Sequence, residues 1–177
     1  MARNIEIKAQ LDAGAGDHVG RRARELATAG PEEIYQHDVF FNCRCGRLKL
    51  RRFADGSGEL IAYQRADTDG PEISSYTLVP CADPARLGEA LGATLGVLGE
   101  VVKQRTVWWI GRSRVHLDTV ERLGRFVELE VVLAAGEDEA AGRREAAELM
   151  SALAIDSRAL ISTAYIDLLR ASGNMLD

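Results

Sequence analysis

The chain has 177 residues, about the size of one domain, and 46% of them are hydrophobic, which is enough for a substantial core. We therefore expect a single domain covering residues 1–177. The formal net charge is −5, so bulk electrostatics exclude a general binder of nucleic acid or other polyanions. Any anion-binding site must be a local cluster of bases on an otherwise acidic protein.

The sequence also predicts a cytoplasmic location. No apolar run reaches the length of a transmembrane helix, and charged residues close to the N-terminus argue against a signal peptide. The cysteines, Cys43, Cys45 and Cys81, form an odd and small set that fits free thiols in a reducing compartment. Cys43 and Cys45 have the spacing of half a zinc site, but no second cysteine pair or paired histidines complete it.

Hydrophobic periodicity and turn residues predict about eight strands and four helices in one α+β domain. Gly30-Pro31 marks the end of the first helix, Asp55 to Gly58 forms a hairpin turn, and Asp83 caps a later helix. The expected elements are, in chain order, a strand at 3–10, a helix at 15–29, strands at 33–42, 47–53, 59–66 and 72–79, a helix from Asp83 to near Gly96, strands at 101–110, 113–120 and 125–134, and helices at 137–153 and 157–170.

Several of the expected strands alternate between apolar and charged residues. The first places Asn4, Glu6 and Lys8 on one face and Ile5 and Ile7 on the other, because successive side chains of a strand point to opposite faces. Later strands repeat the pattern with bases, with acids or with both. The charged members of these faces are Glu6, Lys8, Arg47, Lys49, Arg51, Arg65, Lys103, Arg105, Arg114, Asp118, Glu128 and Glu130.

Two interpretations of the charged faces remain open. A solvated outer face with salt bridges between strands explains any single strand. Against it, Arg47, Lys49 and Arg51 put three like charges on one face, and these repel unless an anion lies among them. Glu128 and Glu130 form a carboxylate pair suited to Mg²⁺ or Mn²⁺. Around one cavity, such groups would bind a polyphosphate and its metal ion.

The order and spacing of these motifs resemble the CYTH domain, the superfamily of class IV adenylate cyclases and thiamine triphosphatases, also called triphosphate tunnel metalloenzymes. The family signature Glu-x-Glu-x-Lys stands here as Asn-Ile-Glu-Ile-Lys at residues 4–8. The resemblance extends from residue 3 to about residue 168. The further matching segments are 48–51, 63–65, 74–76, 103–105, 114–120 and 123–130.

The resemblance implies an eight-stranded antiparallel closed tunnel with helices packed outside, in which a triphosphate binds together with Mg²⁺ or Mn²⁺. Carried over by position, Glu6, Glu128 and Glu130 would bind the metal, with Asp118 in support. Lys8, Asp118 and His116 are the candidate catalytic residues. The bases expected to contact phosphates are Lys8, Arg47, Lys49, Arg51, Arg65, Lys103, Arg105 and Arg114.

Two positions depart from the family pattern. Asn4 replaces the first glutamate of the signature, which removes one carboxylate, although an amide oxygen can still bind a metal without adding charge. Glu72 stands where a base is expected ahead of Ser74, which lowers the positive potential at one end of the site. Both departures bear on the reaction more than on the fold.

The resemblance favours an enzyme similar to class IV adenylate cyclase, in which the ribose 3′-hydroxyl of ATP attacks the α-phosphorus and expels pyrophosphate. The alternative enzyme is a hydrolase of thiamine triphosphate or inorganic triphosphate. A binder of a phosphorylated metabolite without catalysis, or a tunnel that serves other biosynthetic chemistry, also fits the sequence. The expected partner is a small triphosphate, not nucleic acid or a membrane, and a homodimer is consistent with the family.

A few further residues admit two roles each. His116 is either a general acid or base or a polar lining residue. The His-Asp pair at 37–38 is expected at a strand end or in packing. Trp108 and Trp109 point to opposite faces, so one packs beneath a helix and the other borders an organic group. Tyr165 either closes a tunnel mouth or packs in the core.

Overall fold

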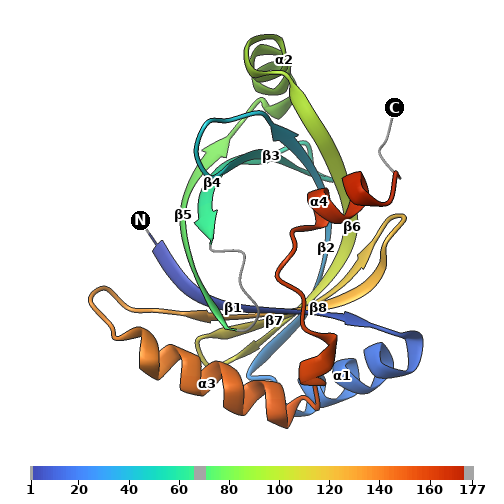
Figure 1. Ribbon diagram of the computed structural model, residues 1–177, viewed down its shortest axis with the longest axis vertical. Helices are drawn as coiled ribbons and strands as arrows, with labels where there is room; N and C mark the ends of the chain where they lie inside the picture. The colour runs from blue at the N-terminus through green and yellow to red at the C-terminus, as the bar shows by residue number, and fades with distance from the viewer. Residues whose placement is uncertain (1, 66–70, 174–177) are drawn as a thin grey trace.

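The structure, a computed structural model, describes residues 2–65 and 71–173, except for the side chain of Arg65. Its strands form one closed antiparallel barrel in the order β1-β5-β4-β3-β2-β6-β7-β8 (Figure 1). This confirms the eight-stranded closed tunnel that the resemblance implies. The strands are β1 (Ala2–Leu11), β2 (Ala29–Phe41), β3 (Arg47–Phe53), β4 (Gly58–Arg65), β5 (Glu72–Cys81), β6 (Val97–Ile110), β7 (Ser113–Val120) and β8 (Gly124–Val132).

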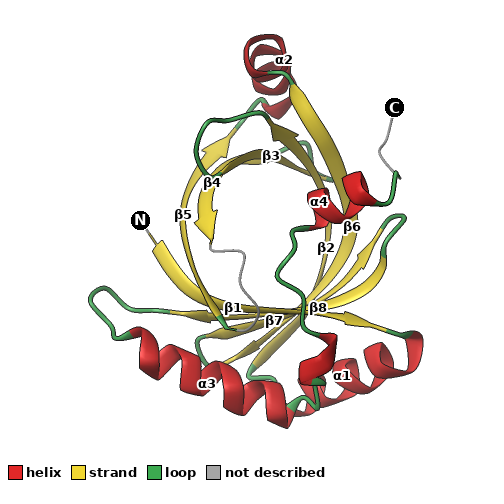
Figure 2. Cartoon of the chain, viewed as in Figure 1, coloured by secondary structure: helices red, strands yellow, loops and turns green. Residues whose placement is uncertain are grey.

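Most helices of the described residues pack against the outside of the barrel wall, and the last begins at Tyr165, which lines the cavity (Figure 2). They are α1 (Ala13–Leu26), α2 (Pro84–Leu95), α3 (Glu139–Ala152), the short 3₁₀ helix η1 (Ser157–Ala159) and α4 (Tyr165–Ala171). The α1 and α3 helices cover β1, β7 and β8, α2 covers β2 and β3, and α4 lies against β6. None of these helices has the length and apolar character needed to cross a membrane.

The period-two pattern is satisfied with the apolar faces outside and the charged faces inside. On β1, Ile5 and Ile7 are buried beneath the helices, together with Leu129 of β8 and Ala146 of α3. Close packing depends on Gly142 of α3, because a Cβ atom there would lie 2.6 Å from a methyl of Leu133. The closed barrel leaves no sheet edge, and the helices remove the outer apolar faces from water, so the charged faces line the interior together with uncharged side chains of other strands.

The structure differs from the prediction of a single helix at 157–170. Asp156 caps only the short η1, residues 160–164 are not helical, and α4 begins at Tyr165. The cause lies in β1, whose Lys8 carbonyl accepts a hydrogen bond from the amide of Ile161 at 2.9 Å. This non-helical segment is thus hydrogen-bonded to β1, and it leads to Tyr165 in the cavity lining. The single helix was predicted from apolar residues at helical spacing, and the tertiary hydrogen bond to β1 outweighs this local preference.

The other boundaries shift by a few residues. The first helix ends at Leu26, earlier than expected, and β2 already begins at Ala29, so Gly30-Pro31 lies within the strand. The predicted cap at Asp83 is confirmed, because its side chain accepts a hydrogen bond from the amide of Arg86 at 3.0 Å. The predicted end of the fourth strand, Ala66, lies outside the described residues.

Candidate active site

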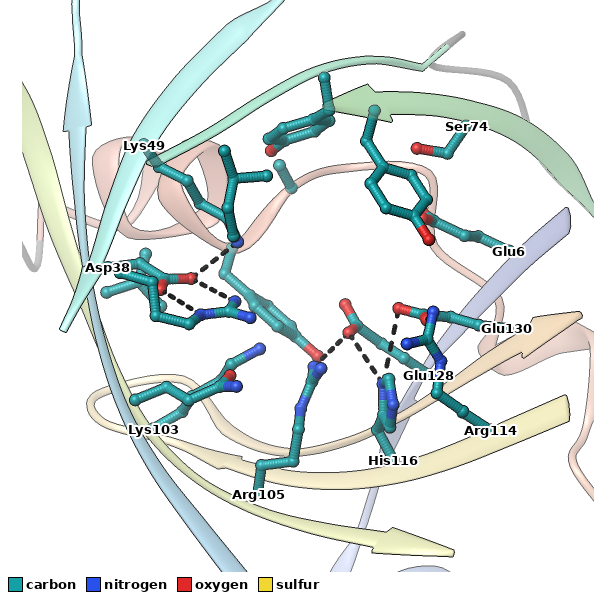
Figure 3. A pocket seen from close by; sticks show the side chains of 18 of the residues that line it. Glu6, Asp38, Lys49, Ser74, Lys103, Arg105, Arg114, His116, Glu128 and Glu130 are labelled. Carbon is teal, nitrogen blue, oxygen red and sulfur yellow. Dashed lines mark hydrogen bonds and ion pairs between the residues drawn. The ribbon is translucent and has the colours of Figure 1, made fainter. Parts of the chain in front are cut away.

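The barrel encloses a cavity of about 310 Å³ that receives side chains from all eight strands and from the start of α4. In Figure 3, Asp38, Lys49 and Lys103 lie on one side of this cavity. On the opposite side lie Glu6, Arg114, Glu128 and Glu130, with Arg105 and His116 between the two groups. The interior is therefore sorted by charge, and its two sides are described in turn.

One side is built around a single carboxylate, and we call Asp38, Lys49 and Arg51 the Asp38 cluster. Asp38 is 2% exposed and accepts hydrogen bonds from Lys49 Nζ at 2.7 Å and from Arg51 Nε at 2.8 Å. Burial alone would raise the pKa of Asp38, but the positive charges of Arg51 and Lys49 hold it far below its usual range. Burial and the charge of Arg51 lower the pKa of Lys49 to about 8.

A second buried carboxylate holds the bases of β6 in place. Asp118, opposite Arg105 in the β6–β7 register, accepts hydrogen bonds from Arg105 Nε at 2.6 Å, Lys103 Nζ at 3.0 Å and the Tyr165 hydroxyl at 3.1 Å. Burial opposes ionisation, yet the charges of Arg105 and Lys103 lower the pKa of Asp118 to about 2. Asp118 itself is fully buried and does not line the cavity, so it fixes the two bases that do.

The other side gathers what we call the Glu128 cluster, which consists of Glu128, Glu130, His116 and Arg114. Glu130 pairs with Arg114 at 2.6 Å, while Glu128 pairs with Lys8 at 3.2 Å and also with Arg105. Burial would raise the pKa of Glu128, but nearby bases, Lys8 foremost, hold it well below its usual value. Burial would also raise the pKa of Glu130, but nearby positive charges lower it, so both carboxylates are ionised at neutral pH.

His116 completes this cluster. Its side chain is 4% exposed, and its Nδ1 lies 3.7 Å from Glu130 Oε1 and 3.9 Å from Glu128 Oε2. Burial and the charge of Arg105 lower the pKa of His116, so the imidazole is neutral at pH 7.

The same three side chains have the arrangement of a metal site. Potential ligand atoms of His116, Glu128 and Glu130 lie within 4.8 Å of one another. Among the described residues, nothing donates to or accepts from His116 Nδ1, and the same holds for the buried Asn4 Oδ1 at the cavity surface. Glu6 lies opposite Glu130 in the β1–β8 register and also faces the cavity. The donor set of His116, Glu128 and Glu130 thus fits a divalent ion, and Glu6 faces the same cavity outside this group.

The wall formed by β4 and β5 differs from the rest. The described side chains that these strands contribute to the cavity are uncharged: Ile61, Tyr63, Ser74, Tyr76 and Leu78. Phe40 of β2 and Trp109 of β6 add further apolar surface. The cavity therefore combines ionic sides with an aromatic and aliphatic wall.

Most of the residues predicted from the sequence meet in this cavity. Those that line it are Glu6, Lys8, Lys49, Arg51, Lys103, Arg105, Arg114, His116, Glu128 and Glu130. Arg47 is not among them, because it forms an ion pair at 2.6 Å with Asp167 of α4. Asp118 lies behind the wall, and the side chain of Arg65 is outside the described residues.

The role predicted for Asp38 from the sequence was wrong. A strand-end or packing role was expected for the 37–38 pair, whereas His37 pairs with Glu100 at 2.6 Å away from the cavity and Asp38 is central to it. The signal was present, since Ile34, Gln36 and Asp38 continue one face of β2 with period two. The two tryptophans divide as expected: Trp108 packs in the core beneath the helices and Trp109 lines the cavity.

The cysteine pair does not form a metal site in the described part of the chain. Cys43 and Cys45 are exposed and free, and they belong to no cluster of potential ligands there.

Comparisons with known proteins agree with the architecture. The CYTH domain model matches residues 2–165, whereas no curated protein matches the sequence. The PH1012 protein from Pyrococcus horikoshii has a TM-score of 0.82 at 21% identity, over 93% of this chain and 98% of that chain. A candidate adenylate cyclase from Vibrio parahaemolyticus has a TM-score of 0.73 at 17% identity, over 94% and 97%. HpAC1 from Hippeastrum, an adenylyl cyclase candidate described as having a dominant triphosphatase activity, has a TM-score of 0.67 at 15% identity, over 99% and 98%.

Proposed function

Because this chain belongs to the CYTH domain family, we propose that it is a metal-dependent enzyme that acts on an organic triphosphate inside its barrel. The observation that supports this most strongly is the barrel cavity in which lysines and arginines face carboxylates and an imidazole. Phosphate oxygens pair with such bases, and divalent ions bind such carboxylates. Conversion of ATP to cyclic AMP and pyrophosphate is the first candidate reaction.

The bases of the cavity are already oriented for phosphate. Asp118 holds Arg105 through two hydrogen bonds of 2.6 Å, so the guanidinium has a fixed direction before any ligand binds. Asp38 does the same for Arg51 at 2.8 and 2.9 Å. Such preorganised charges stabilise negative charge that develops on phosphoryl oxygens without the cost of reorienting during the reaction.

A bound divalent ion would polarise a phosphoryl oxygen and neutralise part of the triphosphate charge. Glu6, Glu128 and Glu130 would hold it, and Glu130 would then give up its ion pair with Arg114. Arg114 and Lys8, which now pair with carboxylates, would turn to phosphate oxygens. The ion would replace the bases as the partner of the carboxylates, and the triphosphate would replace the carboxylates as the partner of the bases. We therefore expect the ion and the triphosphate to bind cooperatively.

The uncharged wall supports an organic rather than an inorganic triphosphate. Tyr63, Tyr76, Ile61 and Leu78 offer apolar surface to a group that a bare polyphosphate lacks. A base or sugar packed there would place its phosphate chain between the ionic sides. The nucleoside of ATP and the heterocycles of thiamine triphosphate both meet this requirement.

Hydrolysis is the second candidate reaction. HpAC1 from Hippeastrum shares the fold and is described as having a dominant triphosphatase activity although it is classed with adenylyl cyclases. Water attack at the terminal phosphorus would use the same bases and the same metal ligands. The two reactions differ in which phosphorus faces the nucleophile.

Product analysis tests the proposal. Purified protein is incubated with ATP, thiamine triphosphate or tripolyphosphate, each with Mn²⁺, Mg²⁺ or neither. Cyclic AMP with pyrophosphate supports the cyclase, and orthophosphate supports the hydrolase. Absence of turnover, combined with metal-dependent thermal stabilisation by a triphosphate, would instead identify a binder without catalysis and overturn the proposed enzyme. The cytoplasmic location, the single domain and the homodimer remain predictions.

A further inference from the structure

The Glu128 cluster contains a ligand type that a magnesium site does not need. His116 Nδ1 is buried, points between Glu128 and Glu130, and has no hydrogen-bond partner within the described ranges 2–65 and 71–173. A buried imidazole nitrogen normally makes a hydrogen bond, because leaving it unpaired costs free energy. An unsatisfied nitrogen at 3.7 and 3.9 Å from two carboxylate oxygens is explained if all three atoms share a cation.

The distances suit one metal centre. Ligand atoms at about 2.1 Å from a tetrahedral or octahedral ion lie roughly 3.0–3.4 Å apart. The separations from His116 Nδ1 exceed this by about 0.3–0.9 Å, and all three ligand atoms lie within 4.8 Å of one another, so rotations of the two glutamate side chains would bring them to one ion. His116 and Glu128 lie directly opposite one another in the β7–β8 register, so the strand pairing itself fixes two of the three ligands.

The composition of the donor set points to the kind of metal. Asn4 stands in place of the first signature carboxylate, and its buried Oδ1 also lacks a partner among the described residues. The set therefore has one carboxylate fewer and one imidazole nitrogen more than an all-glutamate site. Mg²⁺ prefers oxygen ligands, whereas imidazole favours first-row transition ions, whose affinity rises from Mn²⁺ toward Cu²⁺.

We propose that His116 is a nitrogen ligand of the metal held by Glu128 and Glu130, and that this centre selects Mn²⁺ and later first-row ions over Mg²⁺. The inference rests on the proposed function for the presence of a metal. It adds the identity of a ligand and the class of ion. The role differs from general acid–base catalysis by His116, because a metal-bound nitrogen does not exchange a proton with substrate.

The test uses the full-length protein with metal ions alone, without any triphosphate. Calorimetric titration measures the affinities for Mn²⁺ and Mg²⁺, and pulsed electron paramagnetic resonance of the Mn²⁺ complex detects a coordinated nitrogen. We expect the wild-type protein to prefer Mn²⁺ by more than tenfold and to show a nitrogen signal. In His116→Gln the nitrogen signal should disappear, and the preference should fall by at least about tenfold.

His37→Gln is the matched control. His37 is also beside a glutamate, with Nε2 2.6 Å from Glu100, but it does not line the cavity, so its replacement should leave both readouts unchanged. Circular dichroism confirms that each variant is folded. If His116→Gln does not fold, His116→Glu serves instead, because it removes the nitrogen while retaining a ligand and should move the preference toward Mg²⁺.

A nitrogen signal that persists without His116, an equal affinity of the wild-type protein for Mn²⁺ and Mg²⁺, or no metal binding at all would each overturn the inference. The outcomes separate it from the proposed function. A nitrogen-ligated Mn²⁺ site in a protein that converts no triphosphate would refute the enzyme and leave the ligand assignment intact. Normal turnover with oxygen-only coordination would do the reverse.

Discussion

The Asp38 cluster and the Glu128 cluster face each other across the same cavity, yet they are built in opposite ways (Figure 3). In the first, one buried carboxylate is fully engaged by two bases, at 2.7 Å from Lys49 and 2.8 Å from Arg51. In the second, two carboxylates surround an imidazole nitrogen that lacks a partner among the described residues. The Asp38 cluster has two bases for one carboxylate and so presents positive charge to an anion, whereas the Glu128 cluster has two carboxylates for one arginine and so suits a cation.

The largest expected effect comes from removing a carboxylate of the Glu128 cluster. Glu128→Ala and Glu130→Ala should each lower Mn²⁺ affinity and turnover by more than about 100-fold, since even residues that only support metal ligands contribute 10- to 100-fold. Calorimetry with Mn²⁺ and a product assay measure both. Glu100→Gln, which alters the glutamate paired with His37 away from the cavity, is the control. If both glutamate variants bind Mn²⁺ and turn over normally, the site assignment is wrong.

Removing the carboxylate of the Asp38 cluster should raise the affinity for a triphosphate instead of lowering it. Asp38→Asn leaves Lys49 and Arg51 buried without their counter-ion, and loss of one partner of a buried ion pair costs about 3–5 kcal/mol of unfolding free energy. A triphosphate would replace the missing charge, so its affinity should rise while the melting temperature without ligand falls. Thermal shift with and without tripolyphosphate measures the two effects.

Asp118→Asn provides the comparison for this experiment. Asp118 is as deeply buried and also holds two bases, but it lies behind the cavity wall and also accepts a hydrogen bond from Tyr165. Its replacement should destabilise the protein and misorient Arg105, which gives no gain in affinity. Equal ligand affinity in the two variants would show that Asp38 does not compete with the ligand.

The pH dependence of ligand binding distinguishes the two clusters further. Burial and Arg51 lower the pKa of Lys49 to about 8, so its ammonium is present below pH 8 and is lost as the pH rises through this value. Triphosphate affinity should therefore fall by roughly tenfold between pH 7 and pH 9.5, because a charge-assisted hydrogen bond contributes about 1.5–3 kcal/mol. Lys49→Arg keeps its charge throughout and should flatten the profile. A profile that keeps its slope in this variant would assign the titration to another group.

A smaller effect is expected from restoring the family signature. Asn4→Glu adds a carboxylate beside the Glu128 cluster and should raise Mg²⁺ affinity by about tenfold, which narrows the preference for Mn²⁺. Asn4→Asp carries the same charge on a shorter side chain, so comparing the two variants separates the effect of side-chain length from the effect of charge. An unchanged affinity in both variants would place position 4 outside the metal centre.

The smallest effect concerns the uncharged wall. Leu78→Ser removes apolar surface from a cavity-lining residue that is 42% exposed, so the loss of packing against an organic group should be about 1 kcal/mol, or fivefold in affinity. The variant should weaken ATP and leave tripolyphosphate unaffected. Competition binding between the two ligands measures the change, and an equal loss for both would argue against an organic group at this wall.

The sequence alone determined which residues share a strand face. Strict alternation on β1, β3 and β7 decides which residues share a face, because the pleat has a period of two, and the order of the motifs decides the family. Both the alternation and the order of the motifs can be read from the sequence without knowledge of any contact. Ten of the residues predicted in this way line the cavity. The same alternation also allowed the charged faces to lie on the outer, solvated surface, because parity does not say which face is inside.

Tertiary structure decided what parity cannot. Closure of the barrel turned the charged faces inward, and it set which acid meets which base across strands far apart in sequence. It placed Arg47 with Asp167 outside the lining, put Asp118 behind the wall and brought Asp38 into the centre. It also broke the predicted last helix, because the carbonyl of Lys8 accepts a hydrogen bond from the amide of Ile161, and the chain then brings Tyr165 to Asp118. Each of these depends on partners more than 10 residues apart, which local patterns do not encode.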